Sequence, residues 1–290
     1  MQRIFNLLTN TFLKMKKVFL FAAVAAIGLG SCNKSEEATN NSHNVQKISP
    51  NEINVGVLHN QGLDILLEAI TPLYLNKDSV FANYMQVLAE KMDELTALYD
   101  GNVYDFPQLK EIYSNLKSAG EVETYIEEMQ NDLILNAGLV GKMYNELITN
   151  LNELSKNPLF YSDGVYNQVE IIDNMCQEIR EKYLSECKTE LEKFSLKTMT
   201  EICLYSFIYW ADDVNMERWE EAVKYAKKDK KEKKEKKDKS KWEKVGEFVA
   251  ADVGGGLAGG AAGSVIPGVG TAAGAIAGGS CASGATALSW

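Results

Sequence analysis

Residues 253–290 read VGGGLAGGAAGSVIPGVGTAAGAIAGGSCASGATALSW, a stretch of 38 residues without one charged side chain. Glycine inside a helix costs about 0.5–1 kcal/mol relative to alanine, so this many glycines require a gain from close packing. The segment 266–269, IPGV, has Pro267 second and Gly268 third, as a tight turn requires. The sequence therefore predicts a helical hairpin that reverses at this turn.

The glycines of the two predicted arms are spaced so that they face each other. The facing pairs are Gly255 with Gly278, Gly259 with Gly274, and Gly263 with Gly270. Small residues four apart let helix backbones approach closely, and such stripes pair helices in lipid. Because the stretch carries no charge, we predict a glycine-zipper membrane hairpin over residues 245–290, with Trp242 and Trp290 as aromatic anchors at one end. The alternative is a flexible linker rich in glycine, alanine and serine.

A secretion signal precedes the rest of the chain, with Met15 as its expected start. Two lysines are followed by an apolar run, residues 18–29, that is too short to span a bilayer as a mature helix. The end of this run, LGSC at 29–32, resembles the signal of bacterial lipoproteins. The resemblance implies that residues 1–31 are removed and that Cys32 is lipidated and becomes the new N-terminus. An unlipidated Cys32 beside an ordinary cleavage site is the alternative.

The residues after Cys32 extend this resemblance. Residues 33–37, NKSEE, are similar to the acidic export tag of surface lipoproteins of the Bacteroidota. The resemblance implies an outer-membrane lipoprotein exposed at the cell surface. Residues 32–47 as a whole have no apolar periodicity, so we expect a flexible tether between the lipid and the folded part.

Residues 48–222 are the only part long enough to form a packed core of their own. Apolar residues recur at helical spacing in nearly every window, and alternating strand patterns are missing. Breaks are expected at residues 71–72, 100–102, 119–120, 157–158 and 163–164. We therefore predict an all-α fold, with about six to eight helices in an acidic helical domain.

Charge and composition limit the functions open to this domain. From residue 33 to 223 the chain has 33 acidic and 14 basic side chains, a net charge of −19, so nucleic acid is not an expected partner. The whole chain has two histidines, His43 and His59, which leaves too few for a histidine-based triad or a multi-histidine metal site. We predict no enzyme, no metal and no cofactor, although a pair of carboxylates acting as acid and base stays open.

Three cysteines lie within the predicted helices of residues 165–210: Cys176, Cys187 and Cys203. A helix reversal near Ser195 would place Cys187 opposite Cys203, and an oxidising envelope would then allow a disulfide between them. Three buried thiols are the equally supported alternative.

Residues 223–244 change abruptly in character. From residue 224 to 244 there are 12 lysines and five acids, a local net charge of +7. Acids placed four residues before lysines favour an exposed Lys-rich helix. Because this helix would lie beside an apolar hairpin, we expect it to bind an anionic lipid surface. A solvated spacer is the alternative. Arg218 lies just before this segment and is the candidate site for an activating, arginine-specific protease.

The predicted order of parts is lipid, acidic helical domain, Lys-rich helix and apolar hairpin. A hairpin after a soluble helical domain resembles colicin-like pore-forming toxins, and a Gly-rich tail after a basic stretch resembles class II bacteriocins. Together they are similar to the lipoprotein toxins of Bacteroidales, over residues 15–37 and 224–290. The resemblance implies a membrane-active antibacterial protoxin whose partners are a lipid bilayer, an activating protease and an immunity protein. A structural glycine-zipper lipoprotein of the outer membrane is the main alternative, and an unrecognised enzyme or ligand-binding domain is the third.

We predict that Cys32→Ala leaves the protein without a lipid, because the lipidated sulfur is removed. Mass spectrometry of the purified protein measures this directly, and the variant should leave the membrane fraction unless the hairpin alone retains it. An unchanged acylated mass in Cys32→Ala would contradict the prediction.

Overall fold

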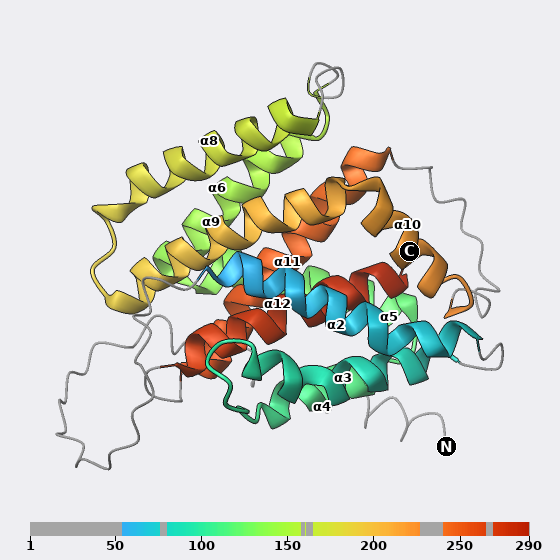
Figure 1. Ribbon diagram of the computed structural model, residues 1–290. Coiled ribbons are helices and arrows are strands. Elements are labelled where there is room, and N and C mark those ends of the chain that lie inside the picture. Colours follow the sequence, from blue (N-terminus) through green and yellow to red (C-terminus); the bar gives the residue numbers. More distant parts are fainter. Residues whose placement is uncertain are drawn as a thin grey trace, which may run out of the picture.

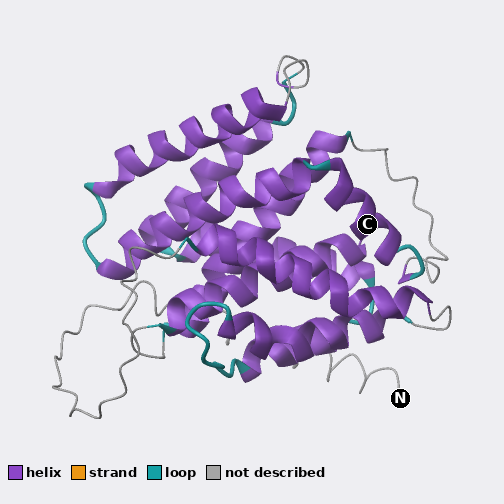
Figure 2. Cartoon of the chain, in the orientation of Figure 1, coloured by secondary structure: helices purple, strands orange, loops and turns teal. Residues whose placement is uncertain are grey.

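The computed structural model describes residues 54–75, 80–157, 160, 165–226, 240–264 and 269–289, and these residues form helices joined by short connections. Within these ranges there are ten helices and no strand (Figures 1 and 2). The prediction of an all-α fold is therefore confirmed. The ten helices are α2 (Val55–Leu75), α3 (Phe81–Ala97), α4 (Pro107–Asn115), α5 (Ala119–Asn136), α6 (Gly138–Leu154), α8 (Val165–Leu184), α9 (Glu190–Ala211), α10 (Asp213–Ala222), α11 (Lys241–Gly263) and α12 (Gly270–Ser289).

The Gly-rich helices α11 and α12 form the centre of the molecule. They run side by side as a hairpin, and nearly every residue from 245 to 289 that the structure describes is buried (Figure 1). Helices α9, α5 and α6 contact α11, whereas α2, α3 and α5 contact α12. Helix α8 lies outside this layer and packs on α9 and α6, and α10 packs on α2 and α9. The hairpin is thus enclosed by the helices that precede it in the chain.

The enclosing helices are amphipathic, and their local sequences explain where they begin. Helix α9 starts with a capping box, in which Thr189 accepts from the backbone N–H of Glu192 and the Glu192 carboxylate accepts from that of Thr189. Helix α11 starts with the same arrangement between Ser240 and Glu243. Helix α5 begins after the cap Ser118, so the expected break at residues 119–120 is the start of a helix.

Two expected breaks fall inside continuous helices. Helix α2 passes through Pro72 and ends at Leu75, because a proline near the end of a helix disrupts few of its hydrogen bonds. Helix α9 is continuous through Ser195, so the reversal predicted there is wrong. The chain reverses instead at residues 185–189, between α8 and α9.

The environment of the hairpin differs from the one that the sequence predicts. We expected lipid around residues 245–290, and in this structure protein surrounds the two arms. Across the described ranges, no helix combines the length and the apolar character that crossing a bilayer requires. The physical reason is that the enclosing helices supply enough apolar side chains to bury the hairpin, for example Leu66, Leu88 and Ile202. The boundary predicted at residue 245 therefore divides a single hydrophobic core.

Several predicted features lie outside the described residues. They are the signal and tether, including Cys32; the turn at Pro267 and Gly268; the Lys-rich residues 227–239; and Trp290. The end of the predicted Lys-rich segment is described and belongs to the first turn of α11, which begins at Lys241.

Candidate functional site

The interface between α11 and α12 consists of backbone against backbone. A Cβ placed on Gly263, Gly259 or Gly274 would collide with the carbonyl oxygen of Gly270, Gly274 or Gly259, respectively. A Cβ on Gly255 or Gly278 would likewise meet the backbone of the other. This is the register that the glycine spacing predicts, and it holds although the arms lie in protein.

Other glycines of the hairpin face outward and receive side chains of the enclosing helices. A Cβ on Gly256 would lie 2.5 Å from Cδ1 of Ile202, and one on Gly279 would lie 3.0 Å from the His59 ring. The hairpin is therefore closely fitted to its enclosing helices as well as to itself.

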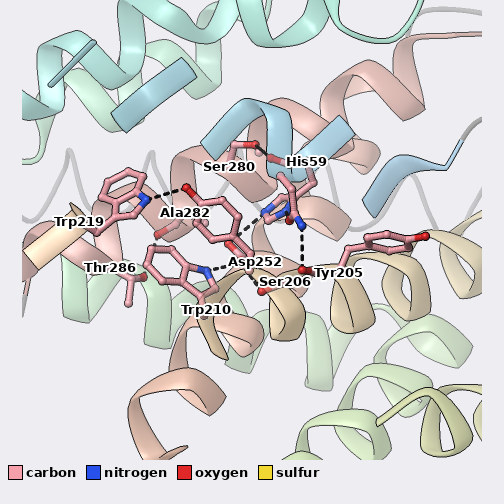
Figure 3. Close-up of polar contacts among 12 residues, drawn as sticks. His59, Tyr205, Ser206, Trp210, Trp219, Asp252, Ser280, Ala282 and Thr286 are labelled. Carbon is pink, nitrogen blue, oxygen red and sulfur yellow. Dashed lines mark hydrogen bonds and ion pairs between the residues drawn. The ribbon is translucent and has the colours of Figure 1, made fainter. Parts of the chain in front are cut away.

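A buried carboxylate, Asp252, lies on α11 at the centre of the fold (Figure 3). It is completely inaccessible to solvent, and its three polar neighbours come from two other helices. Oδ1 lies 3.2 Å from Nε2 of His59 on α2. Oδ2 accepts hydrogen bonds from Oγ of Ser206 at 2.5 Å and from Nε1 of Trp210 at 3.2 Å, both on α9. Ionic and hydrogen-bonding neighbours are what a buried carboxylate requires.

His59 connects Asp252 to a second set of hydrogen bonds. Its Nδ1 lies 3.1 Å from Oδ1 of Asn60, and Nδ2 of Asn60 donates to the carbonyl oxygen of Tyr205 at 2.9 Å. The backbone carbonyl of His59 accepts from Oγ of Ser280 on α12 at 3.1 Å. The two ring nitrogens thus face a carboxylate oxygen of Asp252 and the side-chain oxygen of Asn60. The cluster joins α2, α9, α11 and α12 (Figure 3).

Two tyrosines of the enclosing helices bind the hairpin backbone. The hydroxyl of Tyr144 on α6 donates to the carbonyl oxygen of Ala250 at 3.1 Å, and that of Tyr113 on α4 donates to the carbonyl oxygen of Gly278 at 3.5 Å. Burial raises the pKa of both tyrosines, so both hydroxyls remain protonated donors. Trp210 also stacks on Phe248 of α11, with ring centroids 3.7 Å apart and planes 6° apart.

The arrangement ties the hairpin to α2 and α9 through polar contacts. His59 and Asp252 are both fully buried. Within the described ranges, no three His, Cys, Asp or Glu side chains are grouped as a metal site would require. What the cluster does supply is a set of specific polar contacts that exist only when the hairpin is enclosed.

The predicted pair of Cys187 and Cys203 is not brought together. Both are free, buried thiols, as are Cys176 and Cys281. The disulfide between Cys187 and Cys203 was predicted from a reversal near Ser195, whereas α9 is straight there and Cys187 lies in the connection before it. Cys203 instead contacts Cys176. The alternative of buried thiols is the one the structure has.

Arg218, the predicted processing residue, lies in the middle of α10. Its guanidinium is 3.6 Å from Oδ1 of Asp64, and the next residue, Trp219, is 1% exposed and donates from Nε1 to the Tyr209 hydroxyl. Proteases bind an extended chain, so cleavage after Arg218 requires α10 to unfold first.

The first turn of α11 contacts α10 through charged side chains. Lys241 Nζ lies 2.5 Å from Oδ1 of Asp213, and Lys244 Nζ lies 3.6 Å from Oε1 of Glu220. Trp242, the predicted interfacial anchor, stacks on Phe207 with ring centroids 6.0 Å apart. It is partly buried and packs against the hydrophobic core.

The His59–Asp252 pair was not predicted, although the sequence contains an indication of it. Asp252 is the only charged residue between Glu247 and the end of the given sequence. A single carboxylate in such an apolar stretch needs a partner, and the chain offers one histidine within its predicted helices. The periodicity of the two helices does not reveal that they are neighbours.

The chain matches no protein-family model, and comparison with curated proteins and with solved structures also gave no match.

Two neighbouring glycines of α11 allow a matched test of the hairpin interface. We predict that Gly259→Ala destabilises the protein by about 1–3 kcal/mol or more, because its methyl group collides with the Gly274 backbone. Gly260→Ala should be neutral or stabilising by up to about 1 kcal/mol, because the nearest atom to its new Cβ is 3.4 Å away and alanine favours the helix. Urea unfolding followed by circular dichroism measures both. Equal effects at the two positions would contradict the close contact.

Asp252 provides the second test. Asp252→Ala should cost about 3–5 kcal/mol of stability, because it removes the carboxylate that faces His59 Nε2, Ser206 Oγ and Trp210 Nε1 in the buried core. The double variant His59→Ala/Asp252→Ala should lose clearly less than the sum of the two single losses. Asp213→Ala serves as the control, since this 78% exposed carboxylate pairs with Lys241 at the surface and should cost under about 1 kcal/mol. Additive losses for His59 and Asp252 would contradict a coupled pair.

Proposed function

We propose that this chain is the lipid-anchored precursor of a membrane-active antibacterial toxin, and that the α11–α12 hairpin is its membrane-active part. The observation that supports the proposal most is the enclosure of this hairpin. Its two arms pair through backbone contacts of their own, and the enclosing helices add side-chain contacts around them. A unit that keeps its own interface can exchange its surroundings, from protein to lipid, without losing that interface.

The distribution of charge along the sequence supports a self-restraining precursor. Residues 33–223 carry a net charge of −19, whereas residues 224–244 carry +7. Where the basic segment is described, Lys241 and Lys244 contact acidic residues of α10. Attraction between the two parts favours the enclosed state and lowers the fraction able to bind a membrane.

Activation on this proposal is the opening of the enclosing helices. Arg218 is folded into α10, so an arginine-specific protease acts there only after local unfolding. A lysine-specific protease acting within residues 227–239 would remove the covalent link between the hairpin and the preceding helices. The non-covalent contacts, including the polar cluster around Asp252, would then be all that joins the hairpin to these helices, and contact with a bilayer would have to outweigh them. The partners we propose are accordingly a protease, a target lipid bilayer and an immunity protein in the producing cell.

A second candidate function is a structural lipoprotein of the outer membrane without toxic activity. Two observations favour it. The hairpin is buried in protein, and no helix in the described ranges is suited to cross a bilayer. On this alternative the glycine interface serves only to build a tight core.

A reversible lock on the hairpin separates the two candidates. A Cβ on Gly62 of α2 would lie 3.2 Å from Cβ of Ser280 on α12, so Gly62→Cys/Ser280→Cys places two cysteines near disulfide geometry. The protein is cut with a lysine-specific protease and added to dye-filled vesicles of phosphatidylethanolamine and phosphatidylglycerol. We expect leakage from the cut, reduced variant and at least tenfold less from the cut, oxidised variant.

The wild type with and without reductant is the control, because it reports any effect of the native thiols. Equal leakage from the cut, reduced variant and the cut, oxidised variant would show that the hairpin need not separate from the enclosing helices. No leakage from any form, including the cut wild type, would support the structural lipoprotein instead.

A further inference from the structure

Helices α8 and α9 pack as an antiparallel pair, and one side-chain contact fixes their register. Nε of Arg180 on α8 donates to Oγ1 of Thr200 on α9 at 2.6 Å. Cys176 lies four residues before Arg180 on α8, and Cys203 lies three residues after Thr200 on α9. Both are thus one helical turn from this contact, toward the same end of the helix pair. In an antiparallel pair, four residues back on one helix and three residues forward on the other lead to the same level. The register therefore places the two cysteines opposite each other.

The two thiols are neighbours in the structure. The Cys176 thiol is the first cause of the raised pKa of Cys203, and the two side chains are buried, at 2% and 0% exposed. The other described cysteines have different surroundings: Cys187 lies in the connection between α8 and α9, and the Cys281 thiol faces the carbonyl oxygen of Leu88 on α3.

The distance between packed helices suits a disulfide at this position. Helix axes in contact lie about 8–10 Å apart, and each Cα lies about 2.3 Å from its own axis. Facing Cα atoms are then about 3.4–5.4 Å apart, a range that overlaps the Cα separations of about 4.4–6.8 Å found in disulfides.

We propose that Cys176 and Cys203 form a disulfide that joins α8 to α9 when the chain folds in an oxidising compartment. The predicted secretion signal supplies the reason for such a compartment. The oxidant is a disulfide, either of a protein oxidase or of a small thiol such as glutathione. The thiolate of one cysteine attacks it and forms a mixed disulfide, releasing one thiol of the oxidant. The thiolate of the other cysteine then displaces the second thiol, so two electrons and two protons leave with the oxidant.

The bond forms during folding and persists afterwards. The contact with Cys176 and burial both raise the pKa of Cys203, so the reactive thiolate is scarce once the helices have packed. Burial also protects the finished bond from reduction. Since α9 contacts both α11 and α2, a cross-link between α8 and α9 strengthens the enclosure of the hairpin. The inference stands whether or not the protein is a toxin.

Peptide mapping tests the proposal without relying on activity. The full-length protein is folded in a mixture of reduced and oxidised glutathione, remaining thiols are alkylated in denaturant, and trypsin is added. Trypsin separates the cysteines onto peptides 157–180, 183–188 and 198–218. We expect peptides 157–180 and 198–218 to be linked and lighter by two hydrogens, with Cys187 alkylated. Linkage of Cys187 to Cys203, or alkylation of all three cysteines, would overturn the proposal.

A stability measurement gives a second, independent outcome. Oxidation should raise the melting temperature of the wild type by about 5–10 °C, because the cross-link restricts the unfolded chain. Cys176→Ser should abolish this rise, whereas Cys187→Ser should retain it. A rise that persists in Cys176→Ser would assign the effect to a different bond and overturn the proposal.

Discussion

The fold depends on the close approach of two helix backbones, α11 and α12. Six glycines remove the side chains that would otherwise separate these helices, and the facing carbonyl groups leave no room even for a methyl group. The approach makes the hairpin thin enough for five other helices to contact it, with α9 and α6 on α11, α2 and α3 on α12, and α5 touching both. Glycine weakens an isolated helix, so the packing gained on every side must compensate for the loss of intrinsic helix stability.

Polar contacts give this packing its specificity. Apolar side chains alone permit several arrangements of similar volume, whereas a buried carboxylate demands particular partners. Asp252 finds them on α2 and α9, and Tyr144 and Tyr113 bind hairpin carbonyl groups from α6 and α4. The same contacts add to the cost of disrupting the core, because each of these groups would lose its partner.

The sequence predicts the individual helices better than it predicts which helices pack against one another. The all-α fold and the register between Gly259 and Gly274 follow from short-range periodicity. The environment of the hairpin does not, because a charge-free glycine stripe suits lipid and a protein interior equally well. The pairing of His59 with Asp252 joins residues far apart in the chain, and no local pattern encodes it. The cysteine pairing was wrong for a simpler reason: it assumed a helix break at Ser195, and the chain reverses some residues earlier.

The order of the helices along the chain has a consequence for biogenesis. Helices α2 to α10 are translated before α11 and α12, yet their apolar faces are buried against those later helices. Contacts between α2 and α12 span more than 200 residues, and such long-range contacts slow folding. An emerging chain therefore lacks a large part of its core until α11 and α12 have been translated. Until then the exposed apolar faces of the earlier helices need protection from aggregation.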